Sequence, residues 1–248
     1  MKSWFHSLGL SIQYFSRIPV PFKLNYEEAT IKKTIFFLPL VGWLIGIILY
    51  YFFQMINIFF PIHLQSVLLV AFSLWLTGAL HADGWMDVWD GLGSSKDKEK
   101  VLEIMKDSRV GAMGVVGFVV LFAVKTVSLY SLLDSKYLLE TLIFTPVIAR
   151  WGILLATFIF PYARNNGLGM EFKQWLRCPF FLLSTIWLIP FFWLTAYSLL
   201  MLVVLLSFVL SAGFYFTKKL DGLTGDVYGW LIEGTEALIW LVFVVVAV

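Results

Sequence analysis

Long apolar segments occupy most of this chain, and they limit its fold more than any other feature. A helix that crosses the hydrocarbon core of a bilayer needs about 20 mainly apolar residues. Segments of this length lie at 34–56, 62–80, 111–133, 137–160, 179–197, 198–217 and 230–248. The run from Phe180 to Phe216 is too long for one crossing, so we expect two spans with a turn near Thr195–Ser198. The pattern predicts an all-α, polytopic membrane helix bundle, with about seven transmembrane helices in a single domain over residues 1–248.

Composition agrees with a membrane protein. The chain has 248 residues, of which 60% are hydrophobic and 14% charged, and its mean hydropathy is +0.86. Soluble domains are about 45–50% apolar and about 25% charged. The single cysteine, Cys178, excludes an internal disulfide and a cysteine-based metal site.

The N-terminal segment, residues 1–22, has the pattern of an amphipathic helix at the membrane interface. Apolar residues recur there at helical spacing, at Phe5, Leu8, Ile12, Phe15 and Ile18. Pro19 and Pro21 end the segment. Polar residues interrupt its apolar run and no small-residue cleavage site follows it, so we do not expect a signal peptide.

Basic residues fall on one side of a seven-span arrangement. The spans place fifteen of the 18 lysines and arginines together: Lys2, Arg17, Lys23, Lys32, Lys33, Lys96, Lys98, Lys100, Lys106, Arg109, Arg164, Lys173, Arg177, Lys218 and Lys219. The opposite side has only Lys136, and Lys125 and Arg150 lie within spans. Because cytoplasmic loops carry an excess of Lys and Arg, we expect a cytoplasmic N-terminus and an external C-terminus.

Three aspartates follow the second apolar segment directly. Asp83, Asp87 and Asp90 stand at positions i, i+4 and i+7, so a helix would place all three on one face. Like charges repel at this spacing, and a divalent cation would neutralise them. Carboxylate oxygens suit hard cations, which indicates Mg²⁺ with Mn²⁺ as the alternative. A solvated helix face is the other interpretation, but Trp85, Met86, Val88 and Trp89 make the opposite face apolar.

A second charged group closes the loop that these aspartates open, so residues 81–110 are the predicted cytoplasmic catalytic loop. Asp107 would add a carboxylate to the metal site, and Lys106 and Arg109 would hold phosphate oxygens. Glycines then recur at every third position, at Gly111, Gly114 and Gly117. Close helix packing is the preferred explanation for these glycines.

A third group precedes the last apolar segment. The backbone N–H groups of Thr224 and Gly225 are predicted to bind an anion at a helix N-terminus. Asp226 would be a metal ligand, with an N-cap role as the alternative. His81, two residues before Asp83, is a candidate base, ligand or hydrogen-bond donor.

Ionisable residues also occur inside predicted spans, where they are costly. Glu233 and Glu236 follow Asp226 along the same predicted helix, and Arg150 and Lys125 are the available cations. Arg150 is therefore either an ion-pair partner of these glutamates or a phosphate ligand. The polar loop at 162–169 is explained equally well by substrate contact and by ordinary surface composition.

Four motifs together resemble one known family. They are Thr77-Gly78-Ala79-Leu80-His81-Ala82-Asp83-Gly84, Asp87-Val88-Trp89-Asp90-Gly91, Lys106-Asp107-Ser108-Arg109-x-Gly111-x-x-Gly114 and Leu223-Thr224-Gly225-Asp226. With the segments 16–21 and 37–42, they resemble cobalamin-5′-phosphate synthases, also called adenosylcobinamide-GDP ribazoletransferases, over most of the chain. Ala79 and Asp221 stand where the family pattern has glycines.

The resemblance implies the last joining step of cobalamin assembly. An α-ribazole, or its 5′-phosphate, attacks the cobinamide-side phosphate of adenosylcobinamide-GDP, and GMP leaves as adenosylcobalamin or its 5′-phosphate forms. The expected cofactor is Mg²⁺, and the expected location is the cytoplasmic (inner) membrane with the active site facing the cytoplasm. No nucleic-acid partner is expected, and a homo-oligomer or a complex with other cobalamin-assembly enzymes stays open.

Roles for individual residues follow from the resemblance together with the chemistry. Metal ligands would come from Asp83, Asp87, Asp90, Asp107 and Asp226, and an unliganded aspartate or His81 would take the proton from the attacking hydroxyl. The phosphates would be bound by Lys106, Arg109, Arg150, Thr224 and Gly225.

Two other classes are compatible with parts of the pattern. A CDP-alcohol type phosphotransferase uses a comparable multi-aspartate Mg²⁺ site, but its motif continues differently after Gly91, where this chain has Leu92-Gly93-Ser94-Ser95. A transporter would carry its ionisable residues near the bilayer midplane. Most of those in this chain are instead predicted at one membrane face.

Overall fold

The computed structural model describes residues 2–94, 97–164, 167–176 and 178–247. Lys96 and Arg177 of the basic set and Asn165–Asn166 of the polar loop lie outside these ranges. The described residues are helical almost throughout and form no strand, although an isolated bridge joins Tyr162 to Leu223. The all-α prediction is confirmed.

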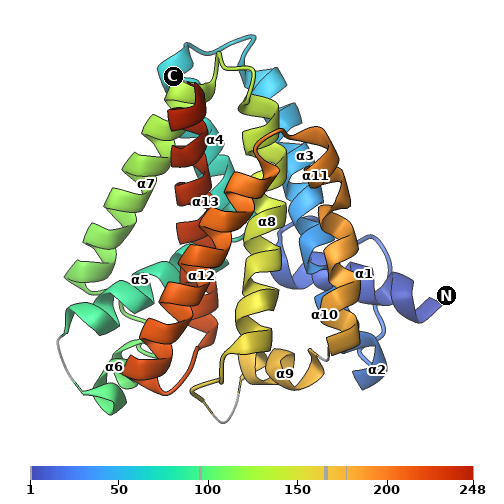
Figure 1. The fold of residues 1–248 in the computed structure, drawn as a ribbon, viewed down its shortest axis with the longest axis vertical. Helices are drawn as coiled ribbons and strands as arrows, with labels where there is room; N and C mark the ends of the chain where they lie inside the picture. The colour runs from blue at the N-terminus through green and yellow to red at the C-terminus, as the bar shows by residue number, and fades with distance from the viewer. Residues whose placement is uncertain (1, 95–96, 165–166, 177, 248) are drawn as a thin grey trace.

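The helices that are long and apolar enough to cross a membrane form an upright bundle (Figure 1). They are α3 (Leu38–Ile56), α7 (Ala112–Leu132), α8 (Leu138–Ile159), α12 (Ser198–Leu220) and α13 (Gly225–Ala247). Two bent helix pairs raise the number of spans to as many as seven. One pair joins α4 (Ile62–Leu76) to α5 (Leu80–Gly93), and the other joins α9 (Leu168–Trp175) to α10 (Cys178–Ser184), η2 (Thr185–Leu188) and α11 (Ile189–Leu194).

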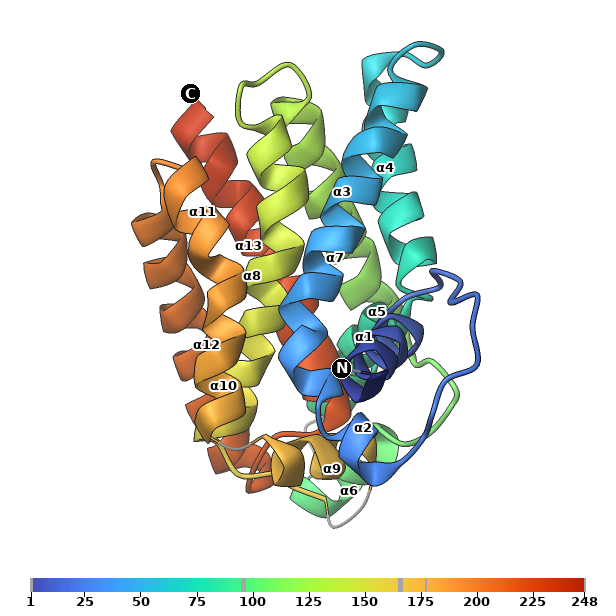
Figure 2. The same cartoon turned by 90° about the vertical axis from the view of Figure 1, so that its right-hand side faces the viewer.

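Shorter elements gather at one end of the bundle, the lower end of Figures 1 and 2. They are α1 (Lys2–Phe15), α2 (Glu28–Ile31), η1 (Thr34–Phe37), α5, α6 (Lys98–Ile104) and α9. The spanning helices run alternately toward and away from this end, and the C-terminus lies at the opposite end (Figure 2). This is the arrangement that the one-sided distribution of basic residues predicts.

The second predicted span differs from the structure in its length and direction. Residues 62–80 were expected to cross in one piece, but α4 ends at Leu76 and α5 leaves it at an angle of 93°. Gly78 and Ala79 make the turn in the left-handed region, with φ of +66° and +57°. The three aspartates therefore lie past the bend of this pair, on a helix set across the end of the bundle.

The fifth predicted span, 179–197, is also not one continuous α-helix. It consists of α10, the 3-10 turn η2 and α11, and Pro190 lies in the first turn of α11. Proline has no N–H to donate to the preceding turn, which explains the break at this point.

The N-terminal helix is shorter than the predicted segment. It ends at Phe15, before the prolines, and its Ser7 hydroxyl donates a hydrogen bond to the carbonyl of Thr30 at 2.8 Å. Leu10 and Phe15 are buried, whereas Phe5, which was counted in the apolar stripe, is 59% exposed. The helix lies across the axes of the spanning helices (Figure 1).

Close packing around α8 holds the bundle together. This helix is the most buried of the five long apolar helices. A Cβ atom on Gly46 of α3 would lie 2.6 Å from the Cα of Ile143, and one on Gly42 would lie 2.6 Å from the Pro146 carbonyl oxygen. The absence of side chains at these two positions lets the α3 and α8 backbones touch, as small residues do in membrane bundles.

The α3–α8 contact can be tested with one matched pair of variants. Gly46→Ala places a methyl group against fixed backbone of α8, whereas Gly152→Ala meets only the end of the Leu205 side chain, at 2.7 Å. Both changes gain the same helix propensity. Overpacking costs about 1–3 kcal/mol, so we expect Gly46→Ala to lower the midpoint of unfolding of the detergent-solubilised protein more than Gly152→Ala does. Equal midpoints would contradict the backbone contact.

Candidate functional site

The site is built where α5 crosses the N-terminal turns of α13. A Cβ atom on Gly84 would lie 2.7 Å from the carbonyl oxygen of Asp226, and one on Gly229 would lie 2.9 Å from the carbonyl oxygen of His81. Neither position can carry a larger residue without moving one helix. Glycine at both positions therefore lets the two helices meet backbone to backbone, although they are more than 100 residues apart in sequence.

This crossing brings the aspartates of α5 together with Asp226. Burial, and then repulsion by Asp226, Asp83 and Asp90, raise the pKa of Asp87 to about 7, while Arg164 opposes the shift. Asp83 is exposed, and among the described residues it has no hydrogen bond or ion pair. The acidic face predicted from the i, i+4, i+7 spacing therefore exists, and it carries more negative charge than its neighbours neutralise.

Arg164 is a basic residue at this site that was not among the predicted site residues. Its Nη2 donates to Asp226 Oδ2 at 2.8 Å, and its Nε is buried with no partner in the described part of the chain. The loop before it is fixed by backbone bonds, because Ala163 N–H donates to the Leu223 carbonyl and Leu223 N–H to that of Pro161. The only signal in the sequence was the polar loop at 162–169.

Thr224 and Gly225 form the start of α13. The Thr224 hydroxyl oxygen accepts from Val227 N–H at 3.2 Å, so Thr224 has the N-cap role that had been considered for Asp226. Thr224 is fully buried, while Gly225 is exposed and lines a pocket beside the carboxylates. Asp226 is therefore not the N-cap, and its Oδ2 accepts from the Thr224 hydroxyl at 3.3 Å.

Asp90 has a structural role in addition to its place on the acidic face. Its Oδ2 accepts from Gly111 N–H and its Oδ1 from Gly114 N–H, both at 2.7 Å. The carboxylate thus satisfies two of the unpaired N–H groups at the start of α7 and complements the helix dipole. A Cβ on either glycine would collide with this carboxylate.

The glycine series Gly111, Gly114 and Gly117 packs α7 against α5, as predicted. Gly117 lies against the Trp89 ring, and a Cβ atom on it would come within 2.5 Å of that ring. The Gly117 carbonyl accepts a hydrogen bond from Trp85 Nε1 at 2.9 Å. The indoles between the aspartates therefore anchor α5 against α7, and Asp90 is the member of the acidic face that contacts the start of α7.

The charged group at 106–109 lies at the surface. Arg109 and Asp107 form a local ion pair at 2.6 Å, and this hydrogen bonding lowers the pKa of Asp107 to about 2. Lys106 is exposed. The segment enters α7 through Gly111, which is bonded to Asp90, so it passes the acidic face, but Asp107 is already neutralised by its own neighbour.

Arg150 belongs to a buried ion network that lies inside the bundle. Its Nη1 contacts Glu236 Oε1 at 3.3 Å, and Lys125 Nζ lies 2.8 Å from carboxylate oxygens of both Glu233 and Glu236. The side chain of Arg150 is fully buried. Of the two roles considered for Arg150, the structure shows the ion pair, and it leaves phosphate binding without support.

His81 lies between this network and the acidic face. It is 4% exposed, and its Nε2 has no hydrogen-bond partner among the described residues. Burial and the nearby Arg150 lower the pKa of His81 to about 3, so the imidazole is neutral. A neutral imidazole with a free nitrogen remains able to donate or accept one hydrogen bond.

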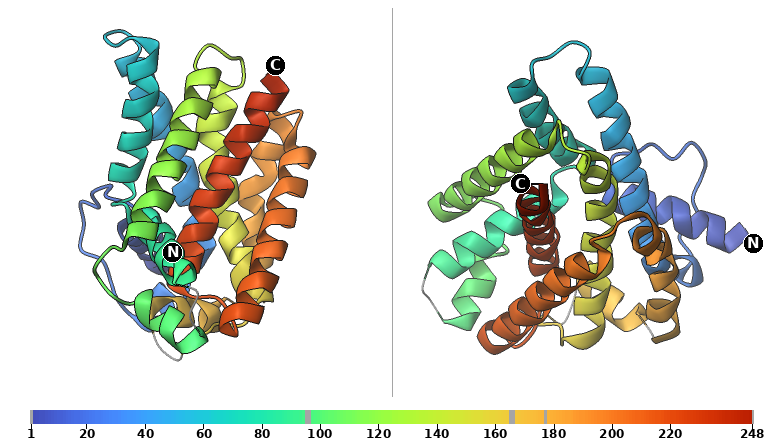
Figure 3. Two further views of the ribbon diagram at one scale, coloured as in Figure 1. Left: turned by 90° about the vertical axis from the view of Figure 1, so that its left-hand side faces the viewer. Right: turned by 45° about the horizontal axis from the view of Figure 1, so that its top comes forward.

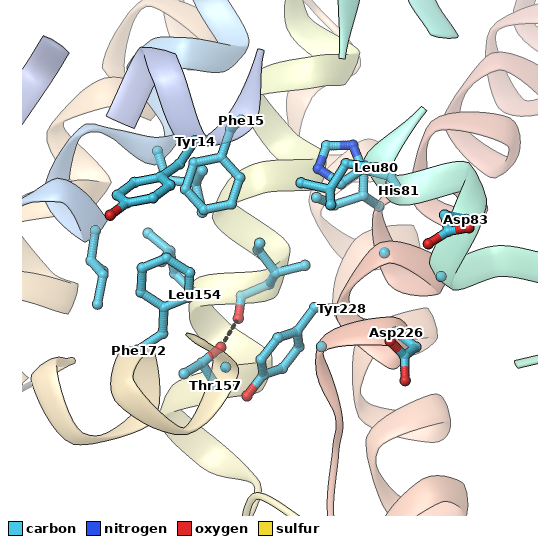
Figure 4. Close-up of a pocket in the computed structure, with 18 of the residues that line it drawn as sticks. Tyr14, Phe15, Leu80, His81, Asp83, Leu154, Thr157, Phe172, Asp226 and Tyr228 are labelled. Carbon is cyan, nitrogen blue, oxygen red and sulfur yellow. Dashed lines mark hydrogen bonds between the residues drawn. The ribbon is translucent and has the colours of Figure 1, made fainter. Parts of the chain in front are cut away.

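A pocket opens beside the carboxylates, with a volume of about 270 Å³ (Figure 4). Asp83 of α5 and Asp226 of α13 lie at one side of it, and aromatic and aliphatic side chains from α1, α8 and α9 lie at the other (Figure 4). His81, Thr157 and Tyr228 also line it. The arrangement combines an acidic mouth with an apolar interior.

The acidic face suits a cation whose coordination shell is completed by substrate. No three His, Cys, Asp or Glu side chains in the described ranges stand close enough to form a closed metal site. Mg²⁺, however, keeps several waters and is usually bound by one or two carboxylates together with substrate phosphates. Asp83, Asp87 and Asp226, of which only Asp226 has an ion-pair partner among the described residues, are suitable donors for such an open site.

The fold and this site define the class. The chain is a polytopic helical protein of the membrane type whose acidic mouth and adjoining pocket lie at one end of the bundle. The chain belongs to the cobalamin-5-phosphate synthase family, whose model matches residues 7–244. It is therefore an enzyme, a transferase of cobalamin biosynthesis, and not a carrier or a CDP-alcohol phosphotransferase.

Curated relatives agree along the whole chain. It is 36% identical to the adenosylcobinamide-GDP ribazoletransferase of Brevibacillus brevis over 98% of both chains. The enzyme of the same name from Caldanaerobacter subterraneus is 37% identical over 96% of this chain and 97% of its own. That from Geotalea daltonii is 35% identical over 96% of each. No solved structure matches the fold.

Variants of Asp87 and Asp90 should have opposite effects on stability in the absence of metal. Asp90→Asn replaces one acceptor by a donor and leaves an N–H of α7 unpaired, which costs about 1–3 kcal/mol. Asp87→Asn removes a charge that its neighbours repel, which should gain a few tenths of a kcal/mol. Thermal unfolding in chelator at pH 8 measures both, with Asp107→Asn as a surface control that leaves the midpoint unchanged. A loss of stability in Asp87→Asn equal to that in Asp90→Asn would contradict this assignment.

Proposed function

We propose that this protein joins a ribazole nucleoside, or its 5′-phosphate, to adenosylcobinamide-GDP and releases GMP. The proposal includes Mg²⁺ as the cofactor and the cytoplasmic face of the inner membrane as the location. The name that the relatives share, adenosylcobinamide-GDP ribazoletransferase, supports both substrates. The observation that carries the proposal is the crossing of α5 and α13, which gathers Asp83, Asp87, Asp226 and Arg164 around one mouth.

The reaction is a displacement at a diphosphate. A ribose hydroxyl forms a new P–O bond to the cobinamide-side phosphate, the bridging P–O bond breaks, and GMP leaves with the electron pair. Negative charge grows on the leaving phosphate, so catalysis depends on placing positive charge there and on accepting the hydroxyl proton.

The residues divide this work. Asp87 and Asp226, with Asp90 beside them, would hold Mg²⁺, which when bound neutralises phosphate charge and orients the diphosphate. Arg164 would bind a phosphate oxygen, because its guanidinium lies beside Asp226 and its Nε has no hydrogen-bond partner among the described residues. Asp83 would take the proton, since it lines the pocket and is free of other partners among the described residues.

Other predicted roles receive less support. His81 is neutral and buried, so it fits a hydrogen-bonding role better than that of the base. Lys106 and Arg109 are exposed beside the acidic face and would meet the outer part of a bound substrate. The basic residues gathered at the same end of the bundle support a cytoplasmic mouth.

Removal of individual carboxylates tests the site. Asp83→Asn and Asp226→Asn should each reduce GMP release by at least about a thousandfold, which is the size of effect that loss of a base or of a charge-stabilising group has. The assay uses purified protein in nanodiscs with both substrates at saturating Mg²⁺. Asp221→Asn, which removes an exposed carboxylate bonded to Lys98, is the matched control and should keep full activity. Near-normal activity of both site variants would overturn the metal and base assignments.

The two candidate phosphate-binding arginines can be separated. Arg164→Gln should lower kcat/KM for adenosylcobinamide-GDP by about a hundredfold, because it removes a charge at the reacting phosphates. Arg109→Gln breaks a surface ion pair and should change kcat/KM by less than about fivefold. The reverse order of effects would transfer the phosphate-binding role to Arg109.

A further inference from the structure

We propose that the apolar part of the pocket is the binding site for the base of the ribazole nucleoside, and that it presents the ribose to Asp83. This inference rests on the proposed function and adds to it which substrate enters the bundle and which stays at the mouth. It also assigns a specificity-determining role to Phe172 of α9 and Leu80 of α5.

The walls of the pocket come from elements far apart in sequence. Phe15 of α1 and Phe172 of α9 lie with their rings stacked, with centroids 5.6 Å apart and planes 29° apart. Leu154 of α8 faces the same space (Figure 4). Leu80 lines the pocket and is 49% exposed, so it stands where the pocket meets the outside.

Volume distinguishes the two substrates. Drug-sized ligands occupy clefts of roughly 300–1,000 Å³, and this pocket, at about 270 Å³, lies just below that range. A bicyclic base with its ribose suits such a space. The corrin macrocycle of adenosylcobinamide-GDP is several times larger, so it must remain outside.

Polarity distinguishes the two bases. Guanine carries several donors and acceptors that would need partners in a buried site. The ribazole base is a dimethylated benzimidazole, planar and almost without hydrogen-bonding groups, which matches a pocket of aromatic and aliphatic walls. The pocket therefore favours the nucleoside over the GDP half of the other substrate.

Two residues that line the pocket carry buried polar atoms without a partner in the described part of the chain. The Tyr228 hydroxyl lies beside Thr157 and is buried, and among the described residues it has no hydrogen-bond partner with suitable geometry (Figure 4). His81 Nε2 is likewise buried without a partner in the described ranges. Leaving such atoms unpaired costs about 1–3 kcal/mol each, and a nucleoside is a ligand that would pair them.

A lipid chain is the competing occupant of an apolar pocket in a membrane protein. Asp83 and Asp226 at the mouth favour the nucleoside, because a carboxylate accepts a hydrogen bond from a ribose hydroxyl, whereas an acyl chain has no group to donate one.

Two variants change the pocket in opposite ways, and a third controls for loss of a stacked ring. Phe172→Ala enlarges the pocket, and Leu80→Trp narrows it from the exposed side. Phe158→Ala removes a partly exposed phenylalanine that stacks on Phe181 at 4.8 Å outside the pocket. Steady-state GMP release then gives KM for each substrate.

We expect both pocket variants to raise KM for α-ribazole about tenfold and to leave KM for adenosylcobinamide-GDP unchanged. Phe172→Ala should also lower KM for a nucleoside with a larger, tricyclic base, and Leu80→Trp should not. Phe158→Ala should match the wild type with every substrate. Unchanged KM for α-ribazole in both pocket variants, with an active wild type, would overturn the pocket assignment alone.

A binding measurement separates this inference from the chemistry. Titration of α-ribazole into wild-type protein in nanodiscs, without the second substrate, should show saturable binding that Phe172→Ala weakens and guanosine does not displace. Displacement by guanosine would indicate that the pocket binds the guanine base instead. Retained lipid with no nucleoside binding would indicate that an acyl chain occupies the pocket. A wild type that binds α-ribazole but releases no GMP would instead reject the proposed function.

Discussion

The contact of the α5 and α13 backbones is the constraint on which the rest of the site depends. Gly84 against Asp226 and Gly229 against His81 bring two helices to a separation that no side chain would permit. The same contact forces carboxylates from both helices together, although their charges repel. Packing therefore holds an arrangement that electrostatics opposes, and a bound cation would relieve that opposition.

Two further interactions resist the repulsion. The carboxylate of Asp90 ties α5 to the start of α7, so this member of the acidic face is stabilised by N–H groups. Deeper in the bundle, Lys125 and Arg150 balance Glu233 and Glu236 and join α7, α8 and α13, whose arrangement side by side is visible in Figure 3. Removing one partner of such a buried set is far costlier than removing all, so the network holds α13, and with it Asp226, at a defined depth.

The sequence was most informative where periodicity and charge carry the signal. The length of the apolar segments predicted the helices, and the basic residues predicted which loops lie at the same end of the bundle. The i, i+4, i+7 spacing predicted the acidic face. The turn between α4 and α5 was not predicted, because alanine at position 79 gives no turn signal. Both Ala79 and Asp221, where the resemblance leads one to expect glycines, have positive φ. The role of Arg164 and the second role of Asp90 depend on contacts across 62 and more than 20 residues, which composition does not encode.

The two halves of the site select by different physics. At the mouth, charge decides: aspartates, Arg164 and a cation act on a diphosphate whatever it is attached to, so this region alone would not distinguish one activated phosphate from another. Inside the pocket, shape and the absence of polar partners determine which base binds, because an apolar wall disfavours a base whose polar groups it leaves unpaired. Asp83 and Asp226 belong to both halves. A nucleoside seated in the pocket therefore meets the reacting phosphate only at these carboxylates, and selectivity for the nucleoside and activation of the diphosphate are joined at one edge of α5.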